Sequence, residues 1–226
     1  IAEHYPSMEK YIAQLIENYR FEGPIPRYGD WLSYDYCKNE YLSSAFLVHD
    51  LDMMIFMSEE LGKTENAENY RQLRKKAHEY FVNTFMENGE LIDKTQTDYV
   101  MAIAFDLIDG DYLKKASGEL VQKIKDNGNR LSTGFVGTYN LCPALSKIGE
   151  DNLAYTLLMQ RNEPSWLYSV DQGATTIWER WNSYTLDKGF GDVGMNSFNH
   201  YAYGSVQEWM YRYMAGIETD GVAFRN

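Results

Sequence analysis

Cysteine, histidine and basic residues are scarce in this 226-residue chain, and each scarcity excludes a class of protein. The two cysteines, Cys37 and Cys142, are too few for a disulfide framework, and neither stands in a metal-ligand spacing. The four histidines form no H-E-x-x-H or related metal motif. Lys and Arg number 21 against 33 Asp and Glu, which gives a formal net charge of -12. Such a charge repels phosphate backbones and excludes nucleic-acid binding and a basic membrane-surface role.

Long apolar runs and nucleophile motifs are absent as well. The longest clean apolar run, from Tyr99 to Phe105, is far shorter than the roughly 20 residues that span a bilayer. No signal peptide is visible, but the chain begins at Ile1 without an initiator Met, so we expect a piece of a longer protein whose compartment stays open. There is no G-x-S-x-G motif, and the glycine-rich segment 189–194 resembles a phosphate loop in composition only. We therefore expect neither a cofactor nor a metal.

Helical periodicity is abundant. Apolar residues recur every three or four positions from Met8 to Tyr19, with Pro6 in the first predicted turn. The same spacing predicts helices over 39–61, 65–86, 97–108, 111–127, 138–148, 151–160 and 199–215. In the second of these eight helices the residues predicted to face inward are Leu42, Ala45, Phe46, Met53 and Phe56. Because nothing alternates with period two, the predicted fold class is all-α, with antiparallel neighbouring helices in a single domain over 1–226.

Three connections between these helices are long, over 24–38, 128–138 and 163–198. Long connections in a compact domain are usually functional or disordered, and the last one holds three of the five Trp, which argues against disorder. Aromatic residues make up 15% of the chain. Their apolar faces and polar tips suit helix packing and sugar binding alike, so composition does not decide between the two.

A carboxylate among tryptophans is the strongest candidate for chemistry. Glu179 stands between Trp178 and Trp181 and next to Arg180. Apolar rings disfavour an ionised carboxylate and a guanidinium favours it, a combination that suits general acid/base catalysis. The same pattern fits a solvated Glu179–Arg180 pair with the Trp residues in the core, so both interpretations stay open.

Two further segments carry candidate binding residues. Asp30 and Trp31 lie in the first long connection, where they would either bind a ligand or form a turn that Asp30 caps and Trp31 fills. Asn199 and His200 precede the last predicted helix, where His200 would either contact a substrate, cap the helix or fill the core.

Taken together and in order, these stretches resemble the bacterial α-L-rhamnosidases of glycoside hydrolase family 78. The resemblance rests on GATTIWERW at 173–181 and MNSFNHYAYG at 195–204. Shorter matches continue it over nearly the whole chain: HYPSM at 4–8, GDW at 29–31, DY at 98–99, TGFVGT at 133–138, PSWLY at 164–168, EWMYR at 208–212 and AGI at 215–217. Several motifs in a fixed order are far more specific than any one of them.

The resemblance implies an (α/α)6 barrel, in which inner and outer helices alternate around a ring. Here the ring would be incomplete, with about eight helices from the C-terminal portion of the catalytic domain. The implied activity is the inverting removal of terminal α-L-rhamnosyl groups from a glycoside or polysaccharide, by a carboxylic acid and a carboxylate held roughly 6.5–9.5 Å apart. Glu179 matches the general base, and Trp31 and His200 match residues of the sugar pocket. The neighbouring positions are weaker candidates for binding or supporting roles: Asp30, Trp178, Arg180, Trp181 and Asn199.

One part of the family pattern is missing from this sequence. The motif with the general acid has no counterpart in 1–226, so we expect it upstream and expect this chain alone to be inactive. The expected partners are the absent N-terminal barrel segment or a second copy, through exposed apolar faces. The segment Asn182 to Gly194 is expected to be a mobile loop beside the pocket. Two alternatives remain: an (α/α)6 hydrolase for another sugar, and a non-catalytic helical glycan-binding module. The compartment, bacterial periplasm or cytoplasm, stays open.

Overall fold

Helices dominate the structure, a computed structural model that describes residues 1–219. Their bounds are Tyr5–Tyr19 (α1), Asn39–Glu60 (α2), Thr64–Phe85 (α3), Gln96–Ala104 (α4), Gly110–Asp126 (α5), Phe135–Lys147 (α6), Asp151–Leu158 (α7), Trp166–Asp171 (α8) and Val206–Trp209 (α9). A 3-10 turn, Ala202–Ser205, leads into α9, and a π-helix, Met210–Met214, follows it. The predicted all-α class is confirmed.

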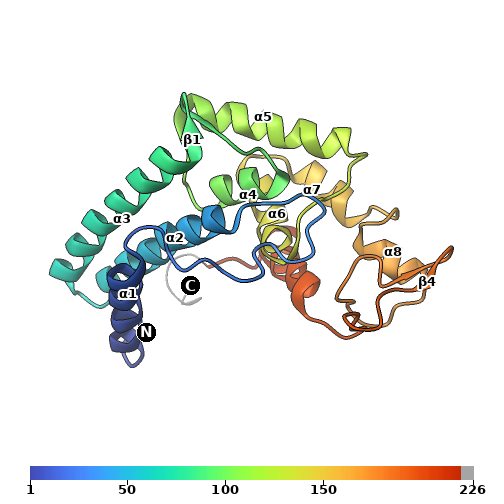
Figure 1. The fold of residues 1–226 in the computed structure, drawn as a ribbon, viewed down its shortest axis with the longest axis horizontal. Helices are drawn as coiled ribbons and strands as arrows, with labels where there is room; N and C mark the ends of the chain where they lie inside the picture. The colour runs from blue at the N-terminus through green and yellow to red at the C-terminus, as the bar shows by residue number, and fades with distance from the viewer. Residues whose placement is uncertain (220–226) are drawn as a thin grey trace.

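The helices alternate between an inner and an outer layer (Figure 1). Inner helices α2, α4, α6 and α9 follow one another through direct contacts, α2 with α4, α4 with α6 and α6 with α9. Outer helices α3, α5 and α7 each pack against the inner helix that precedes them. This alternation is the arrangement expected of an (α/α)6 barrel, and in the described part of the chain it forms an open arc.

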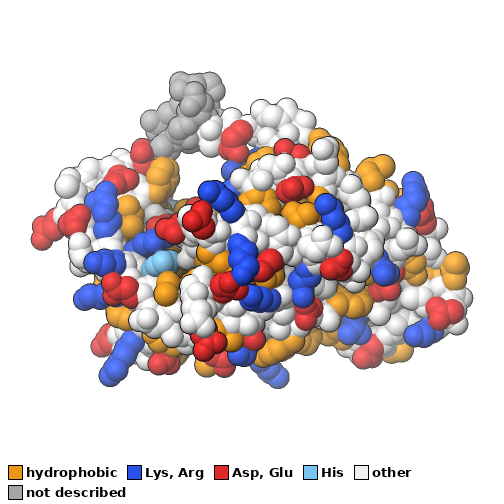
Figure 2. All heavy atoms as spheres, turned by 90° about the horizontal axis from the view of Figure 1, so that it is seen from above, with side chains coloured by type: hydrophobic (Ala, Val, Ile, Leu, Met, Phe, Trp, Pro, Cys, Tyr) orange, Lys and Arg blue, Asp and Glu red, His pale blue; other side chains and the backbone are white. Residues whose placement is uncertain are grey.

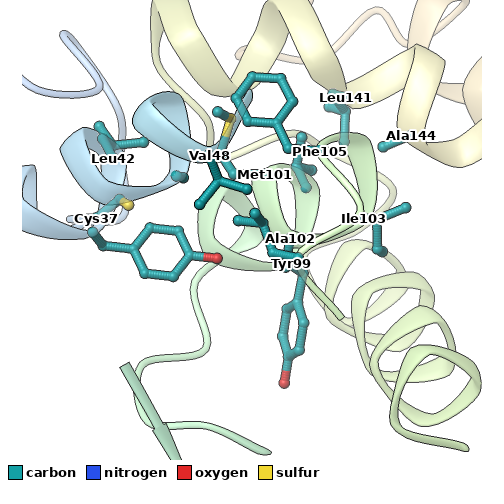
Figure 3. Packing of buried hydrophobic residues seen from close by; sticks show 14 of the residues in the cluster. Cys37, Leu42, Val48, Tyr99, Met101, Ala102, Ile103, Phe105, Leu141 and Ala144 are labelled. Carbon is teal, nitrogen blue, oxygen red and sulfur yellow. The ribbon is translucent and has the colours of Figure 1, made fainter. Parts of the chain in front are cut away.

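The core is densest around α4, which has neighbours on every side. Val100, Met101 and Ala102 are fully buried, and Tyr99 and Ile103 are nearly so. Met101, Ala102 and Ile103 belong to the same buried cluster as Val48 of α2 and Leu141 and Ala144 of α6, all labelled in Figure 3, whereas the Tyr99 ring points away from both helices. A helix that is apolar all round requires burial on every face, and α4 is therefore the centre of the arc.

Several boundaries differ from the sequence prediction. Helix α4 ends at Ala104, four residues before the predicted end, because the chain turns at Asp106 with a φ of +52°. The helix predicted over 199–215 is broken into the 3-10 turn, α9 and the π-helix. Helix α8 was not predicted. It has six residues, too few for a periodic pattern.

Two small antiparallel hairpins were also not predicted. Strands β1 (Met86–Glu87) and β2 (Glu90–Leu91) pair across Asn88 and Gly89, both with positive φ, as a tight hairpin turn requires. Strands β3 (Tyr184–Thr185) and β4 (Gly189–Phe190) pair within the segment 182–194. Two-residue strands have no detectable alternation, and this is why the sequence pattern missed them.

The connections that precede the inner helices meet at one end of the arc. The Tyr34 N–H donates to the Ser132 carbonyl at 2.9 Å, and the Phe135 N–H donates to the Trp31 carbonyl at 3.0 Å. Parallel inner helices place their N-termini, and the loops before them, on the same side. The long connections singled out in the sequence thereby become one loop cluster.

One side of α2 is less buried than predicted. Leu42 and Ala45 lie in the core, whereas Phe46, Met53 and Phe56 are 37%, 43% and 44% exposed. Their spacing puts these three side chains on one side of the helix, away from the core. In the described part of the chain, none of the helices combines the length and hydropathy of a membrane span.

Asp50 shares this side of α2 and gives a pH-dependent prediction. Burial raises the pKa of Asp50 to about 6. Because its pKa in the unfolded chain is near 3.9, folding favours the neutral form, and stability falls as the pH rises from about 4 to 6. Asp50→Asn removes this loss and is expected to raise the free energy of unfolding by about 2–3 kcal/mol at pH 8 but not at pH 4. Urea titrations at both pH values measure the difference.

The matched control is Asp52→Asn, two residues along the same helix. Asp52 accepts from Arg74 at 3.0 and 3.3 Å, so its loss removes an ion pair and leaves the Asp50 titration in place. The gain on going from pH 4 to pH 8 should therefore be specific to Asp50→Asn. An equal gain in both variants would contradict the assignment.

Candidate active site

The buried carboxylate of Asp30 joins its own loop to the first turns of α4 and α6. Oδ2 accepts from the Thr97 hydroxyl at 2.6 Å and the Gly134 N–H at 2.9 Å. Oδ1 accepts from the N–H groups of Val136 and Gly137, at 2.9 and 3.0 Å. Burial raises the pKa of Asp30, and these hydrogen bonds act against that rise. Asp30 thus satisfies the first N–H groups of α6 and ties that helix to α4.

The backbone of Trp31 is held against the start of α6 as well. The Trp31 carbonyl accepts from the Phe135 N–H, and a Cβ at Gly134 would lie 2.3 Å from the Trp31 carbonyl oxygen. Only glycine permits this approach. The indole of Trp31 is partly exposed and packs edge-on against Tyr28, with ring centroids 4.8 Å apart. The sequence left binding and turn formation open for this pair, and the structure places Asp30 in the turn and Trp31 at its surface.

Two further segments, 176–179 and 197–200, lie antiparallel beside this turn. The Glu179 N–H donates to the Ser197 carbonyl at 2.8 Å, and the His200 N–H donates to the Ile177 carbonyl at 2.9 Å. The Thr176 hydroxyl donates to the Phe198 carbonyl. These bonds bring together the two motifs on which the family resemblance depends most.

The Glu179 side chain is oriented by a backbone donor. Its Oε2 accepts from the Ser197 N–H at 2.8 Å, so Glu179 and Ser197 exchange two hydrogen bonds. Among the described residues, Oε1 has no hydrogen-bond partner, and the side chain is only partly buried. One oxygen is thus fixed and the other is left to accept a proton. This is the arrangement that a general base needs.

Aromatic side chains form a wall beside Glu179. Trp181 stacks on Tyr203, with centroids 3.9 Å apart, and meets Trp166 edge-on at 5.3 Å. The Trp166 Nε1–H donates to the Tyr203 carbonyl at 2.8 Å, and Trp178 packs edge-on against Phe198. Trp178 and Trp181 are both buried. The two tryptophans that flank Glu179 therefore support the site from within the core.

Two buried donors in this wall are unpaired. Within residues 1–219, neither Nε1 of Trp181 nor the hydroxyl of Tyr203 has a hydrogen-bond partner. Both residues line a cavity of about 290 Å³ that Arg180 also borders. A buried unsatisfied donor costs about 1–3 kcal/mol, and both of these atoms are buried from solvent. The aromatic lining of the cavity suits the apolar face of a sugar.

The remaining predicted residues lie around these elements. Arg180 and Trp181 also border a second cavity, of about 170 Å³, next to Tyr34. The His200 ring contacts Phe135 at 5.0 Å, and its Nδ1 accepts from the Ala202 N–H at 3.3 Å. Asn199 is exposed, and its N–H donates to the Ser197 hydroxyl. Trp31, Glu179 and His200 line neither cavity.

Phe135 and Tyr203 connect the parts of the site, and neither was predicted from the sequence as a site residue. The Phe135 N–H donates to the Trp31 carbonyl, and the Phe135 ring contacts the rings of His200 and Tyr203, the latter at 5.1 Å. Both residues stand inside motifs that carry the family resemblance. Those motifs are the one sequence signal that points to them, because an aromatic residue at helical spacing is otherwise a core residue.

Other carboxylates at this end serve the fold. Asp98 is buried, accepts from the Cys37 thiol at 3.0 Å and forms a capping box with Thr95 at the start of α4. Asp171 pairs with Arg161. Among the described residues there is no group of three or more His, Cys, Asp or Glu that could hold a metal ion.

An arc of helical hairpins with an oriented carboxylate and an aromatic wall at one end is the architecture of helical-barrel glycosidases. The family model for the bacterial alpha-L-rhamnosidase six-hairpin glycosidase domain matches residues 1–214. The chain belongs to this family, and the (α/α)6 fold that the resemblance implied is confirmed.

Individual relatives agree with this assignment. An alpha-L-rhamnosidase of Formosa agariphila is 40% identical over 96% of this chain and 25% of its own length. The crystal structure of the Streptomyces avermitilis alpha-L-rhamnosidase complexed with L-rhamnose superposes with a TM-score of 0.89 at 38% identity, over 95% of this chain and 21% of that one. The alpha-L-rhamnosidase of Aspergillus terreus gives 0.90 at 33% identity, over 99% and 28%. The chain thus spans 21–28% of the length of these proteins.

The role of Asp30 in positioning the loops predicts a large loss of stability on its removal. Asp30→Ala leaves the N–H groups of Gly134, Val136 and Gly137 without their acceptor. We expect a loss of about 3 kcal/mol in the free energy of unfolding, measured by urea denaturation.

Asp35→Ala is the control, five residues later in the same connection. Asp35 lies 3.9 Å from Lys123 in a partly exposed ion pair. Its removal should cost no more than about 0.5 kcal/mol. Equal losses in the two variants would show that Asp30 is not the anchor of this loop.

Proposed function

We propose that the protein containing this chain removes terminal α-L-rhamnosyl groups from a glycoside or polysaccharide by inverting hydrolysis. Family membership supports the rhamnosidase activity. The observation that carries the mechanism is the Glu179 carboxylate, with Oε2 held by the Ser197 N–H and Oε1 unpaired among the described residues. In this proposal Trp31, His200, Arg180, Trp181 and Asn199 surround the sugar, and the buried Asp30 and Trp178 support them from behind.

In the proposed reaction Glu179 takes a proton from water as that water attacks the anomeric carbon. A carboxylic acid on the opposite side of the sugar protonates the leaving oxygen, and the two groups are held roughly 6.5–9.5 Å apart so that the water fits between them. Ser197 prevents rotation of the base. The aromatic side chains of Trp181 and Tyr203, which line the cavity of about 290 Å³, are suited to pack against the apolar face of a sugar.

The test is hydrolysis of an aryl α-L-rhamnoside by the complete parent protein and by its Glu179→Gln variant. Glutamine keeps the shape of the side chain and the bond from Ser197 but does not accept the proton. We expect kcat to fall by about 10²–10⁴-fold, the usual contribution of a general base. Glu60→Gln, at the exposed end of α2, is the matched control and should retain kcat.

The outcomes separate the alternatives. Unchanged kcat in Glu179→Gln would assign the base to another residue. Turnover of a different aryl glycoside in place of the rhamnoside would indicate a hydrolase for another sugar, and binding without turnover would indicate a glycan-binding module. Proton NMR of the first product anomer tests inversion, because a retaining enzyme would release the α-anomer first.

We further propose that the general acid lies outside this chain, in the part of the parent protein that its relatives possess in addition. The carboxylates near Glu179 support this, because Asp30 accepts four hydrogen bonds and Glu163 accepts from Tyr34. The isolated 226-residue chain is therefore expected to give no measurable turnover of the aryl rhamnoside. Robust turnover would contradict this and would make one of four carboxyl groups in the chain the acid: Asp30, Asp35, Asp98 or Asp171.

The exposed side of α2 supports the expectation that the N-terminal barrel segment of the parent protein packs against this chain. Phe46, Met53 and Phe56 present apolar surface of the kind that an inner helix of a closed ring buries. We propose that the remaining helices of the parent barrel cover it. In the isolated chain the same surface would favour self-association.

A further inference from the structure

A large groove beside the candidate active site has no role in the proposed chemistry. It is a groove of about 800 Å³, within the roughly 300–1,000 Å³ that is typical of ligand sites. One wall is the C-terminal half of α5, from Glu119 to Asp126, and the other is formed by the loops before α2, α4 and α6. Because α5 runs opposite to the inner helices, its C-terminal half lies at the same end of the arc as Glu179.

Tyr34 separates this groove from the site. It lines the groove and also the cavity bordered by Arg180 and Trp181. The Tyr34 hydroxyl donates to the Glu163 carboxylate, which holds the half-exposed ring in place. A molecule that extends from the site past Tyr34 therefore enters the groove without crossing another element.

The charges of the groove favour an uncharged ligand. Lys94 pairs with Glu90 and Glu119, and Lys123 with Asp35, while the Arg130 guanidinium donates to backbone carbonyls. The lining has four acidic side chains for these three basic ones: Asp35, Glu119, Asp126 and Glu163. Figure 2, which looks onto the side of α3 and α5, shows acidic and basic side chains interspersed, without a large patch of one sign. An anionic ligand would therefore find no excess of positive charge in the groove.

The groove also offers groups that bind hydroxyls. Gln122 and Asp126 are exposed on α5 and contact each other at 2.7 Å, where their amide and carboxylate supply donors and acceptors. Tyr34 supplies an aromatic face. Neutral sugars, with apolar ring faces and hydroxyl edges, match this combination.

We propose that this groove binds the saccharide to which the terminal sugar is attached, as a neutral oligosaccharide chain on the leaving-group side of Glu179. The proposal rests on the proposed function, because a hydrolase that removes a terminal sugar must direct the rest of its substrate out of the site. It specifies that function further: the substrate is a rhamnose-terminated neutral glycan with several sugars beyond the bond that is cleaved.

The experiment compares two substrates in the complete parent protein. One is an aryl α-L-rhamnoside, which has no sugar to place in the groove, and the other is a panel of neutral rhamnose-terminated oligosaccharides in several linkages. Gln122→Ala/Asp126→Ala removes the contacting pair from the groove. We expect kcat/KM on the best oligosaccharide to fall about tenfold, mainly through KM, with the aryl rhamnoside changed less than about twofold.

The matched control is Asp111→Ala/Lys114→Ala, which removes another contacting polar pair from the opposite end of α5, outside the groove. It should leave both substrates unchanged. Retained aryl activity also shows that each variant is folded.

Each other outcome overturns a specific statement. Equal kcat/KM on the oligosaccharides in the groove variant and the control overturns the groove proposal, as does a parent protein that cleaves the aryl rhamnoside and no member of the panel. Stronger dependence on the groove for uronic-acid-containing oligosaccharides overturns its neutral specificity. A parent protein that cleaves no rhamnoside at all overturns the proposed function, and the groove proposal with it.

Discussion

The hydrogen bonds of the buried Asp30 carboxylate organise the active end of this molecule. Its two oxygens replace the missing acceptors of the first turn of α6 and bind the hydroxyl of Thr97 in α4. Because a buried carboxylate is tolerated only when its oxygens are satisfied, the loop that carries it has one position. This constraint places Trp31, the next residue, on the surface of the site. Phe135 connects Trp31 to His200, because its N–H donates to the Trp31 carbonyl and its ring contacts the His200 ring.

The proposed chemistry depends on both backbone pairing and aromatic packing. Paired segments at 176–179 and 197–200 position Glu179, while Trp181, Trp166 and Tyr203 pack together as a wall beside it. Two buried donors in that wall have no hydrogen-bond partner among the described residues, which costs stability. The wall borders a cavity that Glu179 itself does not line.

Local patterns predicted the helices well where the helices are long and periodic. Helices α2, α3 and α5 begin and end within one residue of prediction, since their apolar spacing is set by the backbone itself. Phe46, Met53 and Phe56 were expected inside and are partly exposed, because periodicity identifies an apolar side and not what covers it. The hairpins of two-residue strands and the broken helix after His200 depend on turns and contacts distant in sequence, which no local window contains.

The sequence by itself determined the all-α class, the alternation of helices with long connections, and the motif order that identifies the family and singles out Glu179. It left the role of Asp30 undecided between ligand binding and capping. Only the tertiary structure decided that, because its donors come from residues 67 to 107 positions away. The groove beside Tyr34 is likewise visible only in the tertiary structure. Its walls come from α5 and from loops before three inner helices, and only folding brings them together.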